Sequence, residues 1–220
     1  MTLDLDISHA CAVTDISVDA ALEGMSILIT SAIDRNIPAR TTHSQRVATL
    51  AASIAEELNL SLKEVERIYL AGLFHDFGKL FLPSNVLIKR EPLSEDDWSF
   101  IQLHPQLGAT FLEHVPPFHD LAKDVLHHHE RIDGRGYPRR LSGEDIPIGA
   151  RIIAVAESFD AMTALDSYRT SLQQDIAGDI LIQDSGTQFD GGVVQALLAV
   201  LDRRRPHVRS TLEANINAKR

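Results

Sequence analysis

The sequence predicts an all-α protein, a single domain built as a bundle of about seven helices. Apolar residues recur with a helical period along most of the chain, and strand signals are sparse. Neither an internal repeat nor a Pro/Gly/Ser-rich linker divides the 220 residues, and a chain of this length can bury one substantial core. We therefore expect one domain over residues 19–203, with a lead-in over 1–18 and a tail over 204–220.

Two helices are predicted at the start of this domain. The first runs from about Asp19 to Arg35 and ends before Pro38, because the residue preceding a proline is pushed out of the α region. The second has the clearest period in the chain, and its apolar face is made of Val47, Leu50, Ala51, Ile54, Ala55 and Leu58. His43 lies one turn earlier on that same face.

The next helix is expected over roughly residues 61–76. Its apolar stripe ends in Asp76, and Gly78 is predicted to stop the helix. Ser94 followed by three acidic residues is typical of a new helix start, because the side chain caps free backbone N–H groups and the acids face the positive end of the helix dipole.

A proline interrupts the helical pattern that follows Ser94. Pro105 is expected to kink or restart it at His104, since proline lacks the N–H that continues a helix. Trp98 and Phe111 are predicted to be core residues.

Four further helical patterns complete the domain. One carries His128 and His129 on its inward face and opens into a turn over residues 133–138, where two glycines and a proline specify a sharp bend. The others cover residues 149–165, 171–182 and 191–202. Glu157 and Asp160 lie at i and i+3 of the first of these, so both can project the same way.

Composition excludes several classes of protein. The net charge of −10 argues against an electrostatic surface for nucleic acid or anionic membranes. Cys11 is the only cysteine, so no intrachain disulfide is expected, and no apolar run approaches the length of a membrane span. The first residues also lack a basic and then apolar secretion signal. A cytoplasmic protein is expected.

Half of the ten histidines fall on inward helix faces or helix ends, together with two acids. The group consists of His43, His75, His104, His128 and His129, with Asp76 and Glu157. A single histidine on an apolar face is usually an ordinary core or surface residue. Several ionisable groups that converge on one core need a shared counter-charge, because each would be costly to bury alone. The set therefore predicts a metal centre.

The ligand types narrow the identity of the metal. Imidazole and carboxylate without thiolate suit iron, manganese, zinc or cobalt, and they disfavour a closed structural zinc site. Seven candidates exceed one tetrahedral set, so two metals are expected, with Asp76 able to bridge them. Such pairs of ions are used to cleave phosphate esters.

Some neighbouring polar residues are interpreted as structural. Because three consecutive helical residues cannot all face inward, His127 is predicted to be solvated. Glu130 is expected to support a histidine or cap the turn, and Asp133 to form the turn before glycine.

These motifs carry a resemblance to a known family. Residues 75–79 resemble the HD signature of the HD phosphohydrolase superfamily, and residues 133–138 resemble the loop that defines its HD-GYP branch. Further segments match in order and spacing, and the resemblance covers roughly residues 20–203. These segments are 43–47, Trp98, 104–108, 151–156, 159–163 and 186–190.

The resemblance implies an enzyme that hydrolyses the second messenger cyclic di-GMP with bound iron or, next, manganese. It implies that the seven residues above are metal ligands and that Asp76 and Lys79 are catalytic, with Lys79 near the scissile phosphate. Lys79, Tyr137, Asp160 and Arg169 match positions that bind the nucleotide. A signalling partner at the Gly134–Pro138 loop and a homodimer are further expectations.

Three positions depart from the family pattern. Glu157 replaces an aspartate ligand and is one methylene longer. Ala39 stands where members with three metals have glutamate, so two metals are expected here. Asp166 replaces an arginine, which works against binding a doubly charged dinucleotide. Two alternatives therefore stay open: a module that binds cyclic di-GMP or a protein partner without catalysis, and an HD phosphohydrolase acting on other nucleotides.

Overall fold

The computed structural model describes residues 43–89, 91–164 and 171–204, and these residues form helices with no strand among them. The predicted all-α class is therefore confirmed. The expected helix over residues 19–35, the lead-in, the tail after residue 204, and Ala39, Asp166 and Arg169 lie outside the described residues.

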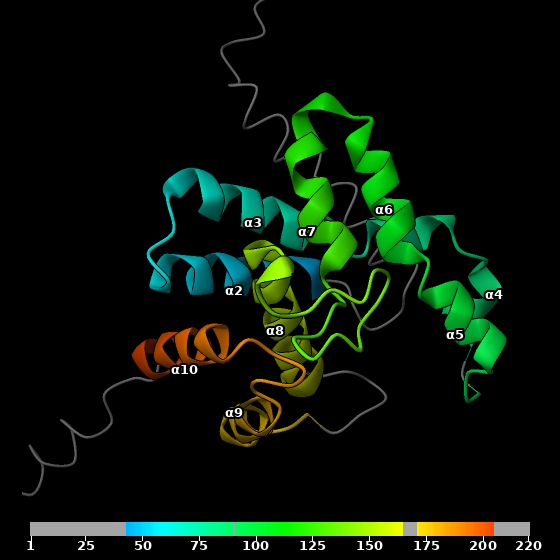
Figure 1. The fold of residues 1–220 in the computed structure, drawn as a ribbon. Coiled ribbons are helices and arrows are strands. Elements are labelled where there is room, and N and C mark those ends of the chain that lie inside the picture. The colour runs from blue at the N-terminus through cyan, green and yellow to red at the C-terminus, as the bar shows by residue number, and fades with distance from the viewer. Residues whose placement is uncertain (1–42, 90, 165–170, 205–220) are drawn as a thin grey trace, which may run out of the picture.

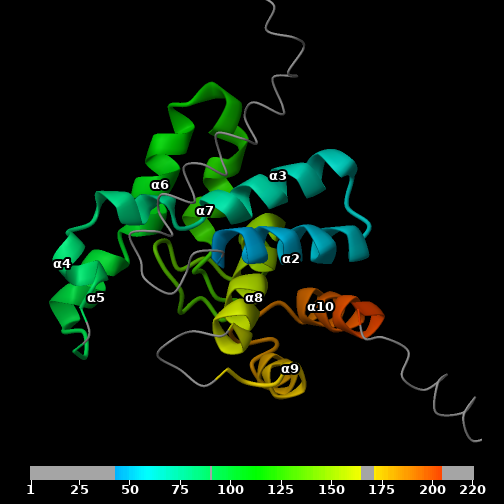
Figure 2. The same ribbon diagram turned by 180° about the vertical axis from the view of Figure 1, so that it is seen from behind.

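The first two described helices form a hairpin, with α2 (His43–Glu57) lying beside α3 (Leu62–Phe74) in both views (Figures 1 and 2). A capping box starts α3, because the Ser61 side chain accepts from the Glu64 backbone N–H and the Glu64 side chain accepts from Ser61. Gly72 lets the two helices approach closely, since a Cβ there would lie 2.9 Å from Cα of Ala48. This contact fixes the end of α3 against the start of α2.

The end of α3 differs from the prediction. The helix stops at Phe74, so His75 is its C-cap and Asp76 lies beyond it, before a 3-10 turn over Phe77–Phe81. Gly78 does not stop the helix. It is needed because it packs against the start of α6 (His104–Glu113), where a Cβ would lie only 2.7 Å from the Gly108 nitrogen.

Between these elements the chain forms the short α4 (Ser84–Leu87) and α5 (Glu95–Ile101), which lie at one side of the bundle (Figure 1). The predicted start of α5 is confirmed by a capping box between Ser94 and Asp97. The restart at Pro105 is also confirmed, because α6 begins at His104 with proline in its first turn.

The prediction that Trp98 and Phe111 are core residues is wrong. Trp98 is 51% exposed and Phe111 is 42% exposed. Helix α5 contributes no buried residue, so its aromatic side chain has no core to enter. The Phe111 ring instead covers Phe77 and Phe81 at the surface.

The remaining helices complete the bundle around α8 (Ile148–Thr163), which lies at its centre in Figures 1 and 2. It contacts α2, α3, α7 (Ala122–His127), α9 (Gln174–Gln183) and α10 (Gly191–Arg204). Ile152, Ile153, Val155 and Ala156 are fully buried, so α8 supplies much of the core. Short 3-10 turns over Pro116–Leu121 and Gly143–Asp145 connect neighbouring helices. No helix within the described residues is long and apolar enough to cross a membrane.

Candidate metal centre

Six side chains form two groups, and in each group three potential ligand atoms lie within 4.8 Å of one another. One group, here the imidazole triad, consists of His104, His128 and His129. The other, here the mixed triad, consists of His43, His75 and Glu157. The structure thus brings together six of the seven residues predicted as ligands, and the seventh, Asp76, lies between the triads.

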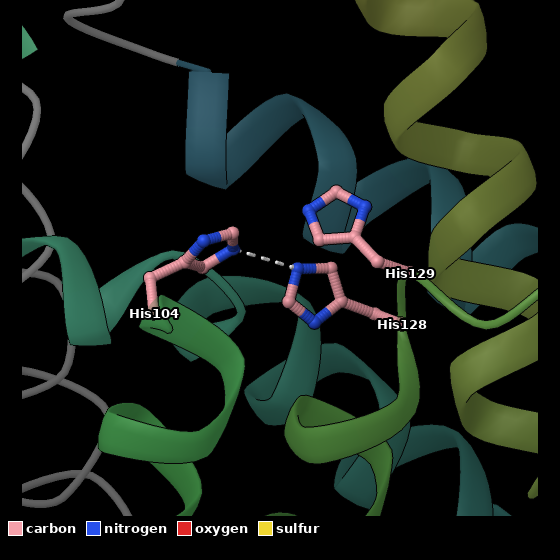
Figure 3. Close-up of side chains that lie close together, drawn as sticks. All are labelled: His104, His128 and His129. Carbon is pink, nitrogen blue, oxygen red and sulfur yellow. Dashed lines mark hydrogen bonds between the residues drawn. The ribbon is translucent and has the colours of Figure 1, made fainter. Parts of the chain in front are cut away.

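The imidazole triad is built where two helices meet. His104 is the first residue of α6, His128 is the C-cap of α7, and His129 follows it. Figure 3 shows the three rings pointing toward one another from these two places. Rings at helix ends can converge because the backbone beyond the last turn is free to redirect them.

Three of the histidines are held in the same way, by a hydrogen bond from the ring to the carbonyl oxygen three residues earlier. The Nδ1 atoms of His75, His104 and His128 lie 2.7, 2.6 and 2.6 Å from the carbonyl oxygens of Gly72, Ile101 and Val125. A carbonyl can only accept, so each Nδ1 carries the proton. In its neutral form each ring therefore presents Nε2 as a lone-pair donor to a metal, with its orientation fixed.

The Nε2 atoms of His104 and His128 lie 3.3 Å apart. Neither carries a proton when both Nδ1 atoms donate, so two lone pairs face each other. Two imidazole nitrogens that bind one tetrahedral metal at about 2.0–2.1 Å would lie about 3.3 Å apart. The spacing fits a shared cation.

The mixed triad is assembled from distant parts of the chain. His43 begins α2, His75 follows α3, and Glu157 lies in the middle of α8. The Nε2 atoms of His43 and His75 are buried and make no hydrogen bond within the described residues. A bound cation would satisfy both atoms, which would otherwise be costly to bury.

The Asp76 carboxylate connects the two triads. Its Oδ1 lies 3.4 Å from Nε2 of His104, and its Oδ2 lies 3.5 Å from Nε2 of His75. Lys79 Nζ donates to Oδ2 at 2.6 Å. One oxygen is thus directed to each triad, which is the placement required of a carboxylate that bridges two ions.

Burial and charge set the protonation states of the site. Burial lowers the pKa of His104 to about 3 and also lowers the pKa values of His128 and His129. Burial alone would raise the pKa of Glu157, but electrostatic interactions with His129 and His75 outweigh it and lower that pKa to about 2. Neutral imidazoles beside ionised carboxylates form a donor set that fits divalent metal ions.

His43 is held by a side chain, unlike the other anchored histidines. Its Nδ1 lies 2.7 Å from Oδ2 of Asp160, and Arg46 binds the same carboxylate through Nε at 2.5 Å and Nη2 at 2.8 Å. Asp160 is predicted to line the nucleotide pocket, but here its carboxylate contacts His43 and Arg46. Sequence reasoning assigned Arg46 no role, although its position one helical turn after His43 is a usable signal.

The loop after His129 is held against the imidazole triad. As predicted, Glu130 caps it by accepting from the backbone N–H groups of Arg139 at 2.6 Å and Leu141 at 3.1 Å. The Tyr137 ring stacks on His129 with centroids 4.8 Å apart and planes inclined by 28°. The loop thus sets the orientation of one ligand ring and forms a wall beside it.

The prediction that His127 is solvated is wrong. The side chain is only 13% exposed, and its Nδ1 lies 3.7 Å from Oε1 of Glu130. It belongs to neither triad. The reason is that Glu130 turns inward to cap the loop and covers the neighbouring imidazole.

A pocket of about 460 Å³ opens beside the centre. Its lining includes His128, His129, Glu157, Tyr137, Arg131 and Arg135. Both triads therefore contribute a side chain to one cavity, which gives a bound molecule access to the metal centre. Lys79 is not part of this lining and contacts the centre through Asp76.

Comparisons with known proteins agree with this architecture. A family model described as the HD domain matches residues 28–193, so the chain belongs to the HD domain family. A cyclic di-GMP phosphodiesterase response regulator of Xanthomonas campestris is 40% identical over 156 residues, which are 70% of this chain and 41% of that protein. A 3′3′-cGAMP-specific phosphodiesterase of Vibrio cholerae is 36% identical over 186 residues, which are 84% of this chain and 40% of that protein. The chain spans about two fifths of the length of these relatives.

Solved structures show the same fold. The cyclic GMP-AMP phosphodiesterase V-cGAP3 of Vibrio cholerae matches with a TM-score of 0.65 and 22% identity, covering 84% of this chain and 49% of that one. An HD-GYP type protein of Bdellovibrio bacteriovorus matches with a TM-score of 0.61 and 21% identity, covering 84% and 60%. The family match and the relatives named above confirm the resemblance to the HD phosphohydrolase superfamily, and these structures confirm its fold.

Proposed function

We propose that this chain is a phosphodiesterase that hydrolyses cyclic di-GMP with two divalent metal ions. The observation that carries the proposal is the placement of Asp76, whose two oxygens lie 3.4 Å from His104 and 3.5 Å from His75. A single metal would need only one of the triads. A carboxylate shared between two complete triads is the arrangement used to cleave phosphate esters.

We propose that the bound ions are iron, with manganese as the next candidate for both positions. The donors are five imidazoles and two carboxylates without a thiolate, and such sets suit these borderline ions. When bound, two such ions supply an acidified water and neutralise charge on the phosphate. His43, His75 and Glu157 would hold one ion, His104, His128 and His129 the other, and Asp76 both.

Lys79 and Asp76 are the catalytic residues in this proposal, because Lys79 would contact the reacting phosphate and Asp76 would hold both ions. Lys79 uses one N–H to hold Asp76 at 2.6 Å, which leaves two donors for a phosphate oxygen. Its positive charge opposes the negative charge that grows during attack on phosphorus. Asp76 stays ionised because, against the effect of burial, the positive charge of Lys79 holds the pKa of its carboxyl well below the usual range.

The substrate class follows from the relatives and the pocket. The curated relatives described above are named as phosphodiesterases of cyclic dinucleotides. A pocket of about 460 Å³ is large enough for a nucleotide portion of such a ligand. A second candidate substrate is 3′3′-cGAMP, favoured by the relative whose match covers 84% of this chain.

The test is turnover by protein prepared without oxygen and loaded with iron or manganese. Metal content is measured first, with about two equivalents expected. Hydrolysis of cyclic di-GMP and of 3′3′-cGAMP is then followed by chromatography, with Asp76→Asn as the control. Metal-loaded protein that binds cyclic di-GMP but leaves it intact would support a binding module without catalysis. Preferential hydrolysis of mononucleotides would support an HD phosphohydrolase acting on other nucleotides.

Other expectations from the sequence stay predictions. These are the domain limits at residues 19 and 203, the cytoplasmic location, a homodimer, and a protein partner at the Gly134–Pro138 loop. The loop after His129, of which these residues are a part, is exposed at Arg135, Arg139 and Arg140, so a partner could reach it.

A further inference from the structure

We propose that Arg135 binds the second phosphate of a cyclic dinucleotide, the one that is not cleaved, and thereby selects substrates with two phosphates. This inference rests on the proposed function and adds a specificity-determining residue to it. A cyclic dinucleotide carries two phosphodiester groups, and only one can lie at the metal centre at a time. The other needs a separate partner on the protein.

Arg135 lies where such a partner is needed. It lines the same pocket of about 460 Å³ as His128, His129 and Glu157, which belong to the two triads. It is two residues before Tyr137, whose ring stacks on His129. A ligand that enters this pocket with one phosphate at the triads therefore passes the Arg135 position.

The guanidinium of Arg135 is available to a ligand. It makes no hydrogen bond or ion pair to any residue that the structure describes, and the residue is exposed. Arg131 lines the same pocket, but its side chain binds the Asp133 carboxylate and the Gln188 side chain. The Arg139 guanidinium bonds to Gln106. Arg135 is thus the cation of the pocket lining whose guanidinium makes no hydrogen bond or ion pair among the described residues, and its charge interacts only electrostatically with Asp133.

The backbone that carries Arg135 is fixed on both sides. Its own N–H donates to Oδ1 of Asp133 at 3.0 Å. Gly136 packs so closely that a Cβ there would lie 2.5 Å from Cα of Glu130. The Tyr137 N–H donates to the His129 carbonyl at 3.2 Å. A fixed backbone limits the entropy that is lost when the side chain binds an anion.

Charge explains why this position matters. The chain has a net charge of −10, and Glu157 adds an anion to the pocket itself. Lys79 is paired with Asp76, and Arg131 with Asp133. In the proposed function the metal ions and Lys79 serve the phosphate that is cleaved, so the second phosphate needs another cation. A guanidinium suits it because its parallel N–H groups match two phosphate oxygens.

The experiment compares substrates with two phosphates and with one. Arg135→Ser is expected to raise KM for cyclic di-GMP about tenfold with little change in kcat, as lost hydrogen bonds to a charged group predict. Its effect on bis(p-nitrophenyl) phosphate, which has a single phosphate, should be at least about fivefold smaller. Arg135→Lys should restore part of the affinity, because it returns the charge without the planar fork.

The matched control is Arg140→Asn. Arg140 lies on the same loop with a φ of 55°, which asparagine tolerates, and it is not part of the pocket lining. An equal rise in KM for cyclic di-GMP in both variants would show a general charge effect and overturn the proposal. An Arg135→Ser effect that is seen with cyclic di-GMP and absent with cyclic di-AMP would show recognition of the guanine base, and would also overturn it.

Binding separates this proposal from the proposed function. If metal-loaded protein cleaves no cyclic dinucleotide, the proposed function fails, but calorimetry with cyclic di-GMP still compares Arg135→Ser with Arg140→Asn. A tenfold weaker Kd for Arg135→Ser alone would then support the role of Arg135. Unchanged binding by Arg135→Ser would contradict it whatever the activity.

Discussion

The two triads of the candidate metal centre are built in opposite ways. The imidazole triad comes from one stretch of chain, His104 to His129, and two of its rings are anchored by carbonyl groups three residues earlier in the chain. The mixed triad joins α2, the end of α3 and α8, and its His43 is anchored by a side chain 117 residues away. One triad depends on local backbone geometry, and the other depends on the packing of the whole bundle.

The triads also differ in charge. The imidazole triad is neutral, since burial lowers the pKa of His104 to about 3. The mixed triad contains the ionised Glu157 and has the Asp160–Arg46 ion pair behind it. A divalent ion is attracted more strongly by a site that includes an anion. We therefore expect the mixed triad to bind its metal more tightly and to be more sensitive to distant substitutions.

Asp76→Asn should have the largest effect, because it removes the one ligand common to both triads. We expect both metals to be lost and turnover of cyclic di-GMP to fall by at least about a thousandfold. Elemental analysis and a turnover assay measure the two effects. Retention of two metals by this variant would show that the carboxylate does not join the sites.

Glu157→Gln and His128→Gln test the difference between the triads directly. Each should lower the metal content by about one equivalent, and Glu157→Gln should lose the more tightly bound ion because it removes a negative charge. Glu157→Asp keeps the charge and should retain the metal with weaker binding. Titration with a metal-sensitive dye resolves the two affinities. Equal losses in the two Gln variants would remove the proposed asymmetry.

Asp160→Asn examines the side-chain anchor of His43. The amide keeps a hydrogen-bond acceptor for His43 but loses the charge that holds Arg46, so metal affinity at the mixed triad should fall about 10–100-fold. The imidazole triad should keep its affinity. Asp190→Asn is the matched control, because it breaks the ion pair with Arg151 elsewhere in the bundle. A similar loss in both variants would indicate a general effect on folding.

Asp133→Asn should have the smallest effect on metal binding, since Asp133 shapes the loop and belongs to neither triad. The hydrogen bond from Arg131 lowers the pKa of the Asp133 carboxyl to about 2, below its ordinary value of 3.8. Its stabilising contribution is therefore complete above about pH 4 and is lost as the pH falls toward 2. Carboxyl NMR titration measures this pKa, and metal content at neutral pH should be unchanged. A pKa near 3.8 would show that the bond to Arg131 does not persist.

The sequence predicted the helical elements well and some packing details poorly. Periodicity located α2 and α8 within a few residues, the cap at Ser94 located the start of α5, and Pro105 located the start of α6. Gly78 was misinterpreted because a glycine needed for close packing on α6 has the same sequence signal as a helix stop. Trp98 was misplaced because, within the part of the chain that the structure describes, α5 contributes no residue to the core.

The sequence by itself determined the all-α class and the set of ionisable residues on inward faces, because both follow from helical period and from the cost of burying charge. Tertiary structure alone decided how those residues divide. Periodicity states which face a histidine occupies but not which distant side chain it meets. The pairing of His43 with Glu157, the position of Asp76 between the triads, and the use of Asp160 as an anchor all depend on contacts between helices far apart in sequence.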